Sequence, residues 1–345
     1  MMEGAILGYG TIAAGHHEGY LQTPNLRISC IVDERPQRRE AAKKRDPDVA
    51  VFSSMKELFG ARQPHFIDIC TPPSMHLDMI LAALAAGCHV LCEKPFLLDL
   101  RSFDYLLDMA KQTDTFIYPS HNYKFSPVMR RLVEQVRSPE FGQVLRGFFQ
   151  TMRKGHARGV PEWRPDWRRD LAYSGGGIIQ DHATHSIYLA CYLCNSWPEA
   201  ASCVAGNLSN DVFSTTEDTV LLNLYFPNSV QISLDLTWSC AYRHTAYTLI
   251  GSKQNIIVEN DDWWLSEAGS VHRQNVVSDF NDPTHRKWFV DMFQDFKVSI
   301  GDADKQRALL REAWMTCAVI QTAYESVAER GAVRPIPEIP SAIGL

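Results

Sequence analysis

The chain has 345 residues, of which 45% are hydrophobic and 21% charged, and its net charge is −6. This is the composition of a folded globular protein, and at about 100–200 residues per domain it predicts two domains. The negative charge, with basic residues in pairs such as Arg38 and Arg39, argues against nucleic acid as the main partner. The most apolar stretch, residues 77–92, is too short to span a bilayer.

The first residues of the chain and the number of cysteines both favour a cytoplasmic location. No basic segment precedes the apolar residues 4–8, so no secretory signal is expected. The nine cysteines are an odd number without framework spacing, which predicts reduced thiols in a cytoplasmic protein. Cys191 and Cys194 form a C-x-x-C inside an apolar helical pattern with no second pair, so we assign no metal and expect buried thiols.

The first third of the chain alternates strand-like and helix-like segments. This order predicts βαβ units and hence a parallel sheet with helices on both faces. Gly87 stands where a glycine ends the third helix. The predicted strands cover residues 4–8, 27–32, 66–70 and 88–92, and the predicted helices cover 11–21, 35–45 and 76–86.

After residue 119 the pattern changes. Residues 230–238 alternate apolar and polar side chains, which predicts a strand with one buried face in an antiparallel sheet. We place a dinucleotide-binding domain at residues 1–121 and a substrate and oligomerisation domain at 122–345, with the C-terminal helices able to pack back on the first. The other predicted strands are 144–152, 218–226 and 247–250, and the helices are 126–137, 178–192, 285–300 and 306–329.

A dinucleotide-binding fingerprint follows the first predicted strand. Residues 8–13 read G-x-G-x-x-A at the point where a helix begins. Gly8 permits the tight turn, Gly10 lets the backbone approach a pyrophosphate, and the first helical residues Thr11 and Ile12 offer N–H groups to it. A glycine turn without a ligand is the alternative, but strand, turn, helix and acidic residue stand in the required order.

The acidic residue of the fingerprint is Asp33, at the end of the second strand. Its carboxylate would accept hydrogen bonds from a ribose diol and repel a 2′-phosphate, which favours NAD over NADP. Arg35 and Arg38 keep NADP open, because either could reach a phosphate.

Three further motifs follow the fingerprint: Thr-Pro-Pro-Ser-Met-His at residues 71–76, Cys-Glu-Lys-Pro at residues 92–95 and a glycine triplet followed by Asp181 and His185 at residues 175–185. Together with the fingerprint they resemble the glucose–fructose oxidoreductase / inositol dehydrogenase / rhizopine-catabolism (Gfo/Idh/MocA) family. Residues 92–95, Cys-Glu-Lys-Pro, close a strand downstream of the fingerprint, as the family's E-K-P does. Residues 71–76 resemble its T-P-x-x-x-H loop beside the nicotinamide, and residues 175–185 resemble its G-G-G-x-x-x-D-x-G-x-H motif. The likeness covers nearly the whole chain.

The resemblance implies a Rossmann domain followed by an α/β domain with a large, mainly antiparallel, open-faced sheet that commonly mediates oligomerisation. It implies that Thr71, Pro72, His76 and Glu93 lie at the cofactor, and that Lys94 sits near the nicotinamide and the reacting carbon. It further implies that Asp181 and His185 complete a catalytic group across the domain cleft.

The chemistry of an alcohol dehydrogenase suits that set. Histidine titrates near neutral pH and can act as a base, and a lysine ammonium stabilises developing alkoxide charge. Asp181 and His185 are i and i+4 on the predicted helix, so both project from one face. The alternatives are a surface role for Lys94, a core role for His185 and a structural cap or salt bridge for Asp181.

Two departures and three further residues complete the sequence picture. The family usually has glycine where Ala183 stands, and often an acid where Tyr188 stands. Asn122 lies in a segment resembling the family's N-x-R-F-x-P, with a local structural role as its alternative. Trp167 and Arg168 could cover a sugar or acidic substrate. The alternative is that both residues belong to a packed surface loop without a role in binding.

The sequence therefore predicts an NAD-dependent dehydrogenase that acts on a secondary alcohol of a sugar, polyol or sugar derivative, as a homo-oligomer without a nucleic-acid or membrane partner. A redox-neutral glycosidase- or lyase-type enzyme of the same fold, which oxidises its substrate transiently, is the first alternative. A catalytically silent dinucleotide-binding regulator is the second, and the set Lys94, Asp181 and His185 argues against it.

Overall fold

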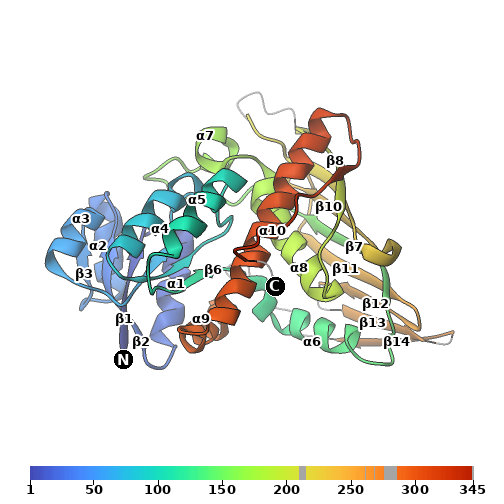
Figure 1. The fold of residues 1–345 in the computed structure, drawn as a ribbon, viewed down its shortest axis with the longest axis horizontal. Helices are drawn as coiled ribbons and strands as arrows, with labels where there is room; N and C mark the ends of the chain where they lie inside the picture. The colour runs from blue at the N-terminus through green and yellow to red at the C-terminus, as the bar shows by residue number, and fades with distance from the viewer. Residues whose placement is uncertain (210–214, 261, 268, 276–285, 344–345) are drawn as a thin grey trace.

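The computed structural model describes residues 1–345 except 210–214, 261, 268, 276–285 and 344–345. Its two sheets lie at opposite ends of the molecule, with one long helix between them (Figure 1). None of the helices within the described ranges combines the length and the apolar character needed to cross a membrane.

The first sheet is parallel and six-stranded, in the order β3-β2-β1-β4-β5-β6, which is the Rossmann order. The four strands predicted from the sequence are present, and β3 and β6 are additional. The strands are β1 (Met2–Leu7), β2 (Leu26–Val32), β3 (Ala50–Phe52), β4 (Phe66–Ile69), β5 (His89–Cys92) and β6 (Ile117–Pro119). The helices between them are α1 (Thr11–Leu21), α2 (Pro36–Arg45), α3 (Met55–Ala61), α4 (His76–Ala85) and α5 (Leu100–Ala110).

Local sequence signals account for the ends of these helices. Ser54 and Asp99 cap α3 and α5, each accepting a hydrogen bond from a backbone N–H three residues on. Pro36 occupies the first turn of α2, where its missing N–H costs nothing. Gly87 has φ +71°, which confirms the expected left-handed glycine after α4.

The second sheet has nine strands in the order β14-β13-β12-β11-β7-β10-β9-β8-β15 and is antiparallel except where β10 pairs with β7. The predicted alternation appears in β10, whose apolar side chains are buried and whose polar ones are more accessible. The strands are β7 (Val144–Met152), β8 (Ala200–Gly206), β9 (Thr219–Tyr225), β10 (Gln231–Thr237), β11 (His244–Gly251), β12 (Gln254–Glu259), β13 (Asp262–Glu267), β14 (Ser270–Asn275) and β15 (Arg334–Pro335).

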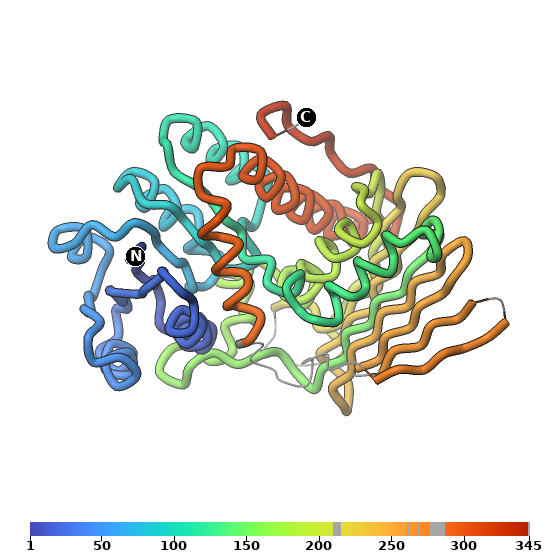
Figure 2. The backbone as a smooth tube through the Cα atoms, turned by 90° about the horizontal axis from the view of Figure 1, so that it is seen from below, coloured from blue at the N-terminus to red at the C-terminus, as the bar shows by residue number. Residues whose placement is uncertain are grey.

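Helix α10 contacts β8 of the second sheet and also α8, and the tube view shows the helices gathered on one side of this sheet (Figure 2). The helices of this part are α6 (Pro127–Val136), α7 (Leu171–Ser174), α8 (Thr184–Cys194), α9 (Arg286–Ser299) and α10 (Ala303–Ala328). The predicted helix at 285–300 begins at Arg286 in the structure, and His285 lies outside the described residues.

The C-terminal helices also contact the first sheet. Helix α9 lies against α1, where Tyr20 and Phe293 stack at 3.8 Å and a Cβ on Gly19 would lie 2.9 Å from the Phe293 ring. Helix α10 contacts strand β6 and helix α5 on the side of the first sheet, and strand β8 and helix α8 on the side of the second. Helices α9 and α10 therefore cover part of the six-stranded sheet and its helices.

Candidate functional site

A cavity of 760 Å³ lies between the two sheets, at the carboxyl ends of the parallel strands. This is where open α/β sheets bind their ligands. Residues that the sequence analysis placed in different motifs line it from both domains: Gly8, Gly10, Thr11, Ile12, Asp33, Thr71, Pro72, Glu93, Lys94, Asn122, Trp167, Arg168, Asp181 and His185.

At the glycine turn, the cavity is lined by backbone atoms without side chains. Gly8 has φ +78°, and a Cβ there would lie 2.7 Å from the Thr71 side chain, so glycine is required. A Cβ on Gly10 would meet nothing within 4 Å, which means that the space above it is open. Gly10 also begins α1 without a side-chain cap. A dinucleotide pyrophosphate fits this end of the cavity, because the N–H groups of the first helical turn point to it.

Asp33 is held at the end of β2 by four N–H donors, one of which is the Arg35 backbone N–H at 3.0 Å. Its carboxylate accepts hydrogen bonds from the Tyr9 backbone N–H at 2.8 Å and from the Arg35 guanidinium at 2.7 and 2.6 Å. The Arg35 guanidinium in turn lies 5.6 Å from the centre of the Trp163 ring. Asp33 thus faces the cavity already oriented, with Arg35 beside it. Arg38 instead lies 3.8 Å from Glu162 and does not line the cavity.

Lys94 and Asp181 meet across the cavity. The Lys94 ammonium donates to the Asp181 carboxylate at 2.8 Å and to the Asp181 backbone carbonyl at 3.0 Å. The Arg168 guanidinium approaches the same carboxylate at 3.3 Å, and His182 Nδ1 lies 3.1 Å from its other oxygen. Burial raises the pKa of Asp181, but the charges of Lys94 and Arg168 outweigh it and hold the pKa well below its usual value.

His185 is buried beside this pair. Its ring stacks on Tyr123 at 4.0 Å, and its Nδ1 lies 2.7 Å from the Tyr188 hydroxyl. Burial and the charge of Lys94 lower the pKa of His185 well below its usual value, so the imidazole is neutral at neutral pH.

The segment that carries Asp181 and His185 differs from the expected continuous α-helix over 178–192. It is a π-helical turn (Ile179–Ala183) followed by α8. Glu217, forty residues away, caps this turn by accepting from the backbone N–H groups of Gly177 and Ile179 at 3.0 Å each. A Cβ on Gly177 would lie 1.9 Å from the Glu217 backbone carbonyl oxygen, so this close approach of the Glu217 segment requires glycine.

His76 lies behind the cavity and is absent from its lining. It is fully buried, with Nδ1 3.0 Å from the Pro95 carbonyl and Nε2 3.0 Å from the Thr71 carbonyl. It therefore ties the Thr71 loop to the segment that follows Lys94, and any influence on a cofactor acts through those two segments.

Several polar residues of the cavity were not singled out individually from the sequence, although three of them lie in loops, 153–173 and 239–246, from which substrate recognition was expected. Arg153, His156, His182 and Arg243 all line the cavity. His182 had an available signal, since it neighbours Asp181. Arg153 and Arg243 lie next to strands far apart in the sequence, so only the sheet brings them to the same site.

Beneath the cavity, a buried cluster holds Glu93. His16 Nδ1 lies 2.8 Å from Asp68 and its Nε2 lies 3.2 Å from Glu93. Cys70 lies 3.5 Å from both His16 and Asp68. Burial acts to lower the pKa of His16, but the Asp68 charge outweighs it and raises the pKa well above its usual value. The imidazolium thus bridges two carboxylates and orients Glu93, which precedes Lys94.

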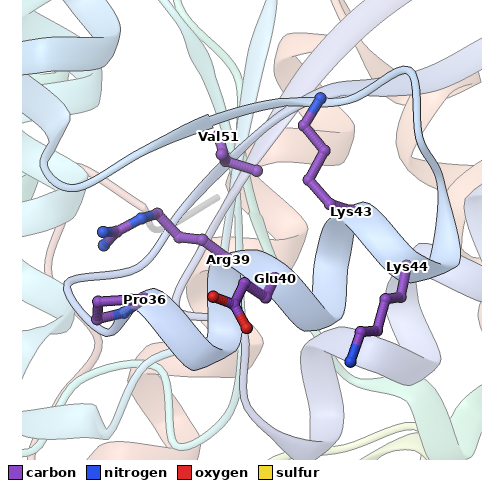
Figure 3. Close-up of a pocket in the computed structure, with 6 residues that line it drawn as sticks. All are labelled: Pro36, Arg39, Glu40, Lys43, Lys44 and Val51. Carbon is purple, nitrogen blue, oxygen red and sulfur yellow. The ribbon is translucent and has the colours of Figure 1, made fainter.

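A second hollow, on α2, shares no lining residue with the cavity. Figure 3 shows Arg39, Lys43 and Lys44 around it. The Arg39 guanidinium donates to the Asp33 and Glu34 carbonyls, and the Lys43 ammonium donates to the Pro47 carbonyl. These bonds fasten the loops that flank the helix.

The fold and the glycine turn define a two-domain protein of the dinucleotide-binding class. The family model for the Gfo/Idh/MocA oxidoreductases, described as an oxidoreductase family with an NAD-binding Rossmann fold, matches residues 2–121. The model for the family's C-terminal domain matches residues 129–257. The chain belongs to the Gfo/Idh/MocA oxidoreductase family, which confirms the resemblance noted in the sequence.

Several relatives have named activities. D-glucoside 3-dehydrogenase of Escherichia coli K12 is 28% identical over 190 residues, which is 55% of this chain and 53% of the relative. The matched region thus spans about half the length of that enzyme. 1,5-Anhydro-D-fructose reductase of Ensifer adhaerens is 21% identical over 255 residues, covering 74% of this chain and 75% of the reductase.

The fold is shared with solved structures. Levoglucosan dehydrogenase, in complex with NADH and levoglucosan, superposes with a TM-score of 0.83 at 18% identity, covering 98% of this chain and 100% of the other. This likeness confirms the expected fold class, a Rossmann domain followed by a domain with a large, mainly antiparallel sheet.

Proposed function

We propose that the protein transfers a hydride between NAD and a secondary alcohol of a sugar, polyol or sugar derivative. The observation that carries this proposal is the 2.8 Å contact between Lys94 and Asp181. It joins the two domains inside the cavity that also contains the glycine turn. An ammonium held by a buried carboxylate next to a dinucleotide site suits the charge that develops on an alcohol oxygen.

Each residue has a defined task in this reaction. Bound NAD would supply the hydride acceptor, with its pyrophosphate on the Gly8 and Gly10 backbone and its ribose diol on Asp33. Lys94 would stabilise the alkoxide or carbonyl oxygen and exchange its proton, and Asp181 would hold Lys94 in place. Thr71, Pro72 and Glu93 would border the nicotinamide.

The substrate side of the cavity is rich in hydrogen-bonding groups. Asn122 and His185 line it, and Arg168 stacks over Trp167 with 4.2 Å between the guanidinium carbon and the ring centre. Such groups suit the several hydroxyls of a sugar. The names of the relatives, a glucoside dehydrogenase and an anhydrofructose reductase, support the same substrate class.

A substrate panel tests the proposal. Sugars, anhydrosugars, inositols and hydroxy acids are assayed for NADH formation, with NADP in parallel and with Lys94→Met as the control enzyme. We expect NADH formation with at least one sugar or polyol, slower turnover with NADP, and none with the variant. Equal rates for wild type and Lys94→Met would contradict the assignment.

A redox-neutral reaction on the same fold is the second candidate. 2,7-Anhydro-N-acetylneuraminate hydratase of Escherichia coli K12 is 22% identical over 320 residues, covering 88% of this chain and 82% of the hydratase. An enzyme of this type would consume a substrate while absorbance at the NADH band returns to its starting value. Product analysis beside the spectrophotometric assay separates the two candidates.

We also propose that the exposed face of the second sheet joins two copies of the chain. Phe148, Leu221 and Ile257 are large apolar side chains on this sheet, with 36%, 43% and 41% of their surface exposed. Exposed apolar groups on one sheet face favour a protein partner. Light scattering after gel filtration is expected to show an oligomer that Leu221→Lys dissociates, and a monomeric wild type would refute it.

A cytoplasmic location completes the proposal. All nine cysteines are free thiols and seven of them are buried, which suits a reducing compartment.

A further inference from the structure

The hydroxyl of Tyr188 lies between two polar groups in the second domain. Its oxygen is 3.2 Å from the backbone nitrogen of Tyr123 and 2.7 Å from Nδ1 of His185. The Tyr188 side chain is 0% exposed, so solvent does not reach it. Within the described part of the chain, its hydroxyl has no third hydrogen-bond partner.

These two contacts fix the direction of both hydrogen bonds. A backbone N–H can only donate, so the Tyr188 oxygen accepts from Tyr123. The hydroxyl proton then has one acceptor within reach, which is the Nδ1 lone pair of His185. The opposite arrangement, with a proton on Nδ1, would leave a buried hydroxyl proton without an acceptor, and buried polar groups are rarely left unpaired.

The other ring nitrogen of His185 belongs to the cavity. In a neutral imidazole only one nitrogen carries a proton, so an unprotonated Nδ1 places the proton on Nε2. His185 lines the cavity together with Lys94, and its Nε2 has no hydrogen-bond partner among the described residues. Stacking on Tyr123 at 4.0 Å holds the plane of the ring.

We propose that Tyr188 is a positioning residue that makes His185 a hydrogen-bond donor, through Nε2–H, to a substrate oxygen. His185 therefore does not take the proton of the reacting hydroxyl, which departs from the base role expected from the sequence. Lys94 first releases one ammonium proton to solvent, and its neutral amine nitrogen then takes the hydroxyl proton as the carbonyl forms and the hydride leaves to NAD⁺. This assignment of the oxygen rests on the proposed function; the protonation state of the ring does not.

A carboxylate at position 188 would have the opposite effect. It can only accept, so it would take a hydrogen bond from Nδ1–H and leave Nε2 with a lone pair that can act as a base. Tyr188→Glu is therefore expected to move the His185 proton from Nε2 to Nδ1. Tyr188→Phe removes the hydroxyl, so no group at position 188 then determines which ring nitrogen carries the proton.

The tautomer can be measured without any turnover. Protein labelled with ¹⁵N-histidine and saturated with NAD is studied by long-range ¹H–¹⁵N correlation, and the His185 signals are identified from their loss in His185→Gln. We expect Nε2 protonated in the wild type and Nδ1 protonated in Tyr188→Glu. Tyr118→Phe is the matched control, because it deletes another buried tyrosine hydroxyl, bonded to Asp295 at 2.7 Å, outside the cavity.

The outcomes decide the proposal directly. A proton on Nδ1 in the wild type, or an unchanged tautomer in Tyr188→Glu, would overturn it. An altered His185 tautomer in Tyr118→Phe would also overturn it, because the loss of a distant buried hydroxyl would then have the same effect as a change at position 188. If no alcohol is oxidised, the proposed function fails while this spectroscopic result stands.

Kinetics give a second readout where a substrate is known. The side-chain amide introduced by His185→Gln can donate a hydrogen bond but cannot take a proton, whereas the methyl group introduced by His185→Ala can do neither. We expect His185→Gln to recover most of the activity that His185→Ala loses, with the remaining loss mainly in KM. Equal losses of about 10²–10⁴-fold in kcat for both variants would restore the base role and overturn the proposal.

Discussion

Lys94 and Lys124 form ion pairs of nearly the same geometry, which makes them a controlled comparison. The Lys94 ammonium lies 2.8 Å from Asp181, and the Lys124 ammonium lies 2.9 Å from Glu312. The lysine side chains are 14% and 20% exposed. Only Lys94 lines the cavity. Replacing each lysine by methionine removes the same charge and keeps a similar length of apolar chain.

The two substitutions should cost similar stability. Removing one partner of a buried ion pair typically costs about 3–5 kcal/mol. Here each carboxylate keeps another partner, since Arg168 remains beside Asp181 and His121 remains 2.6 Å from Glu312. We therefore expect each variant to lose about 2 kcal/mol in the free energy of unfolding, a value below the fully unpaired case.

The effect on turnover should separate them. Lys94 combines charge stabilisation with proton exchange, each of which contributes about 10²-fold or more, so Lys94→Met should lower kcat/KM by at least about 10³-fold. Lys124→Met should stay within about fivefold of wild type, because its pair lies outside the cavity. Urea unfolding gives the free energy of unfolding, calorimetry gives the affinity for NAD, and NADH formation gives kcat/KM. Equal losses of turnover in both variants would refute the reasoning.

Three further predictions concern charge and hydrogen bonding. Burial acts to raise the pKa of Glu312, but Lys124 and His121 outweigh it and lower the pKa to about 2. A lowered carboxyl pKa gives stability that is present above the unfolded value and lost as pH falls towards 2, so Glu312→Gln should flatten the fall in urea stability between about pH 4.5 and 2. Asp33→Ser should raise KM for NAD about tenfold or more and improve the use of NADP, because it removes the diol acceptor and frees Arg35 for a phosphate; unchanged selectivity in paired assays would contradict this. Glu217→Ala should cost about 2–4 kcal/mol in urea unfolding through two unpaired N–H groups, and Glu217→Gln, which keeps an acceptor, less than about 1.

The sequence was informative where a residue acts within its own segment. The glycine turn, the acidic end of β2 and the alternation of β10 are local patterns, and all three are present in the structure. The three-residue strands β3 and β6 were missed, because so short a run gives no period. Strands β12 to β14 were missed for another reason: they lie towards one edge of the sheet and carry many exposed polar side chains.

Long-range contacts set the rest of the site. The π-helical turn before α8 depends on Glu217, which no pattern around residues 175–185 reveals. The bond between Tyr188 and His185 is local, three residues along one helix, but its direction depends on the Tyr123 backbone. For that reason the spacing could suggest His185 as a catalytic residue without showing which nitrogen carries the proton.

The packing of α9 on α1 has a consequence for the order in which the protein can fold during synthesis. The nucleotide-binding sheet is complete in sequence by Pro119, yet its aromatic layer includes Phe289, Phe293 and Phe296. During synthesis, Tyr20 and Phe66 leave the ribosome more than two hundred residues before Phe293 and Phe296, the rings that they contact in the folded protein. Residues 1–121 expressed alone would expose this aromatic layer. The packing of the N-terminal domain is therefore completed only after α9 has been synthesised.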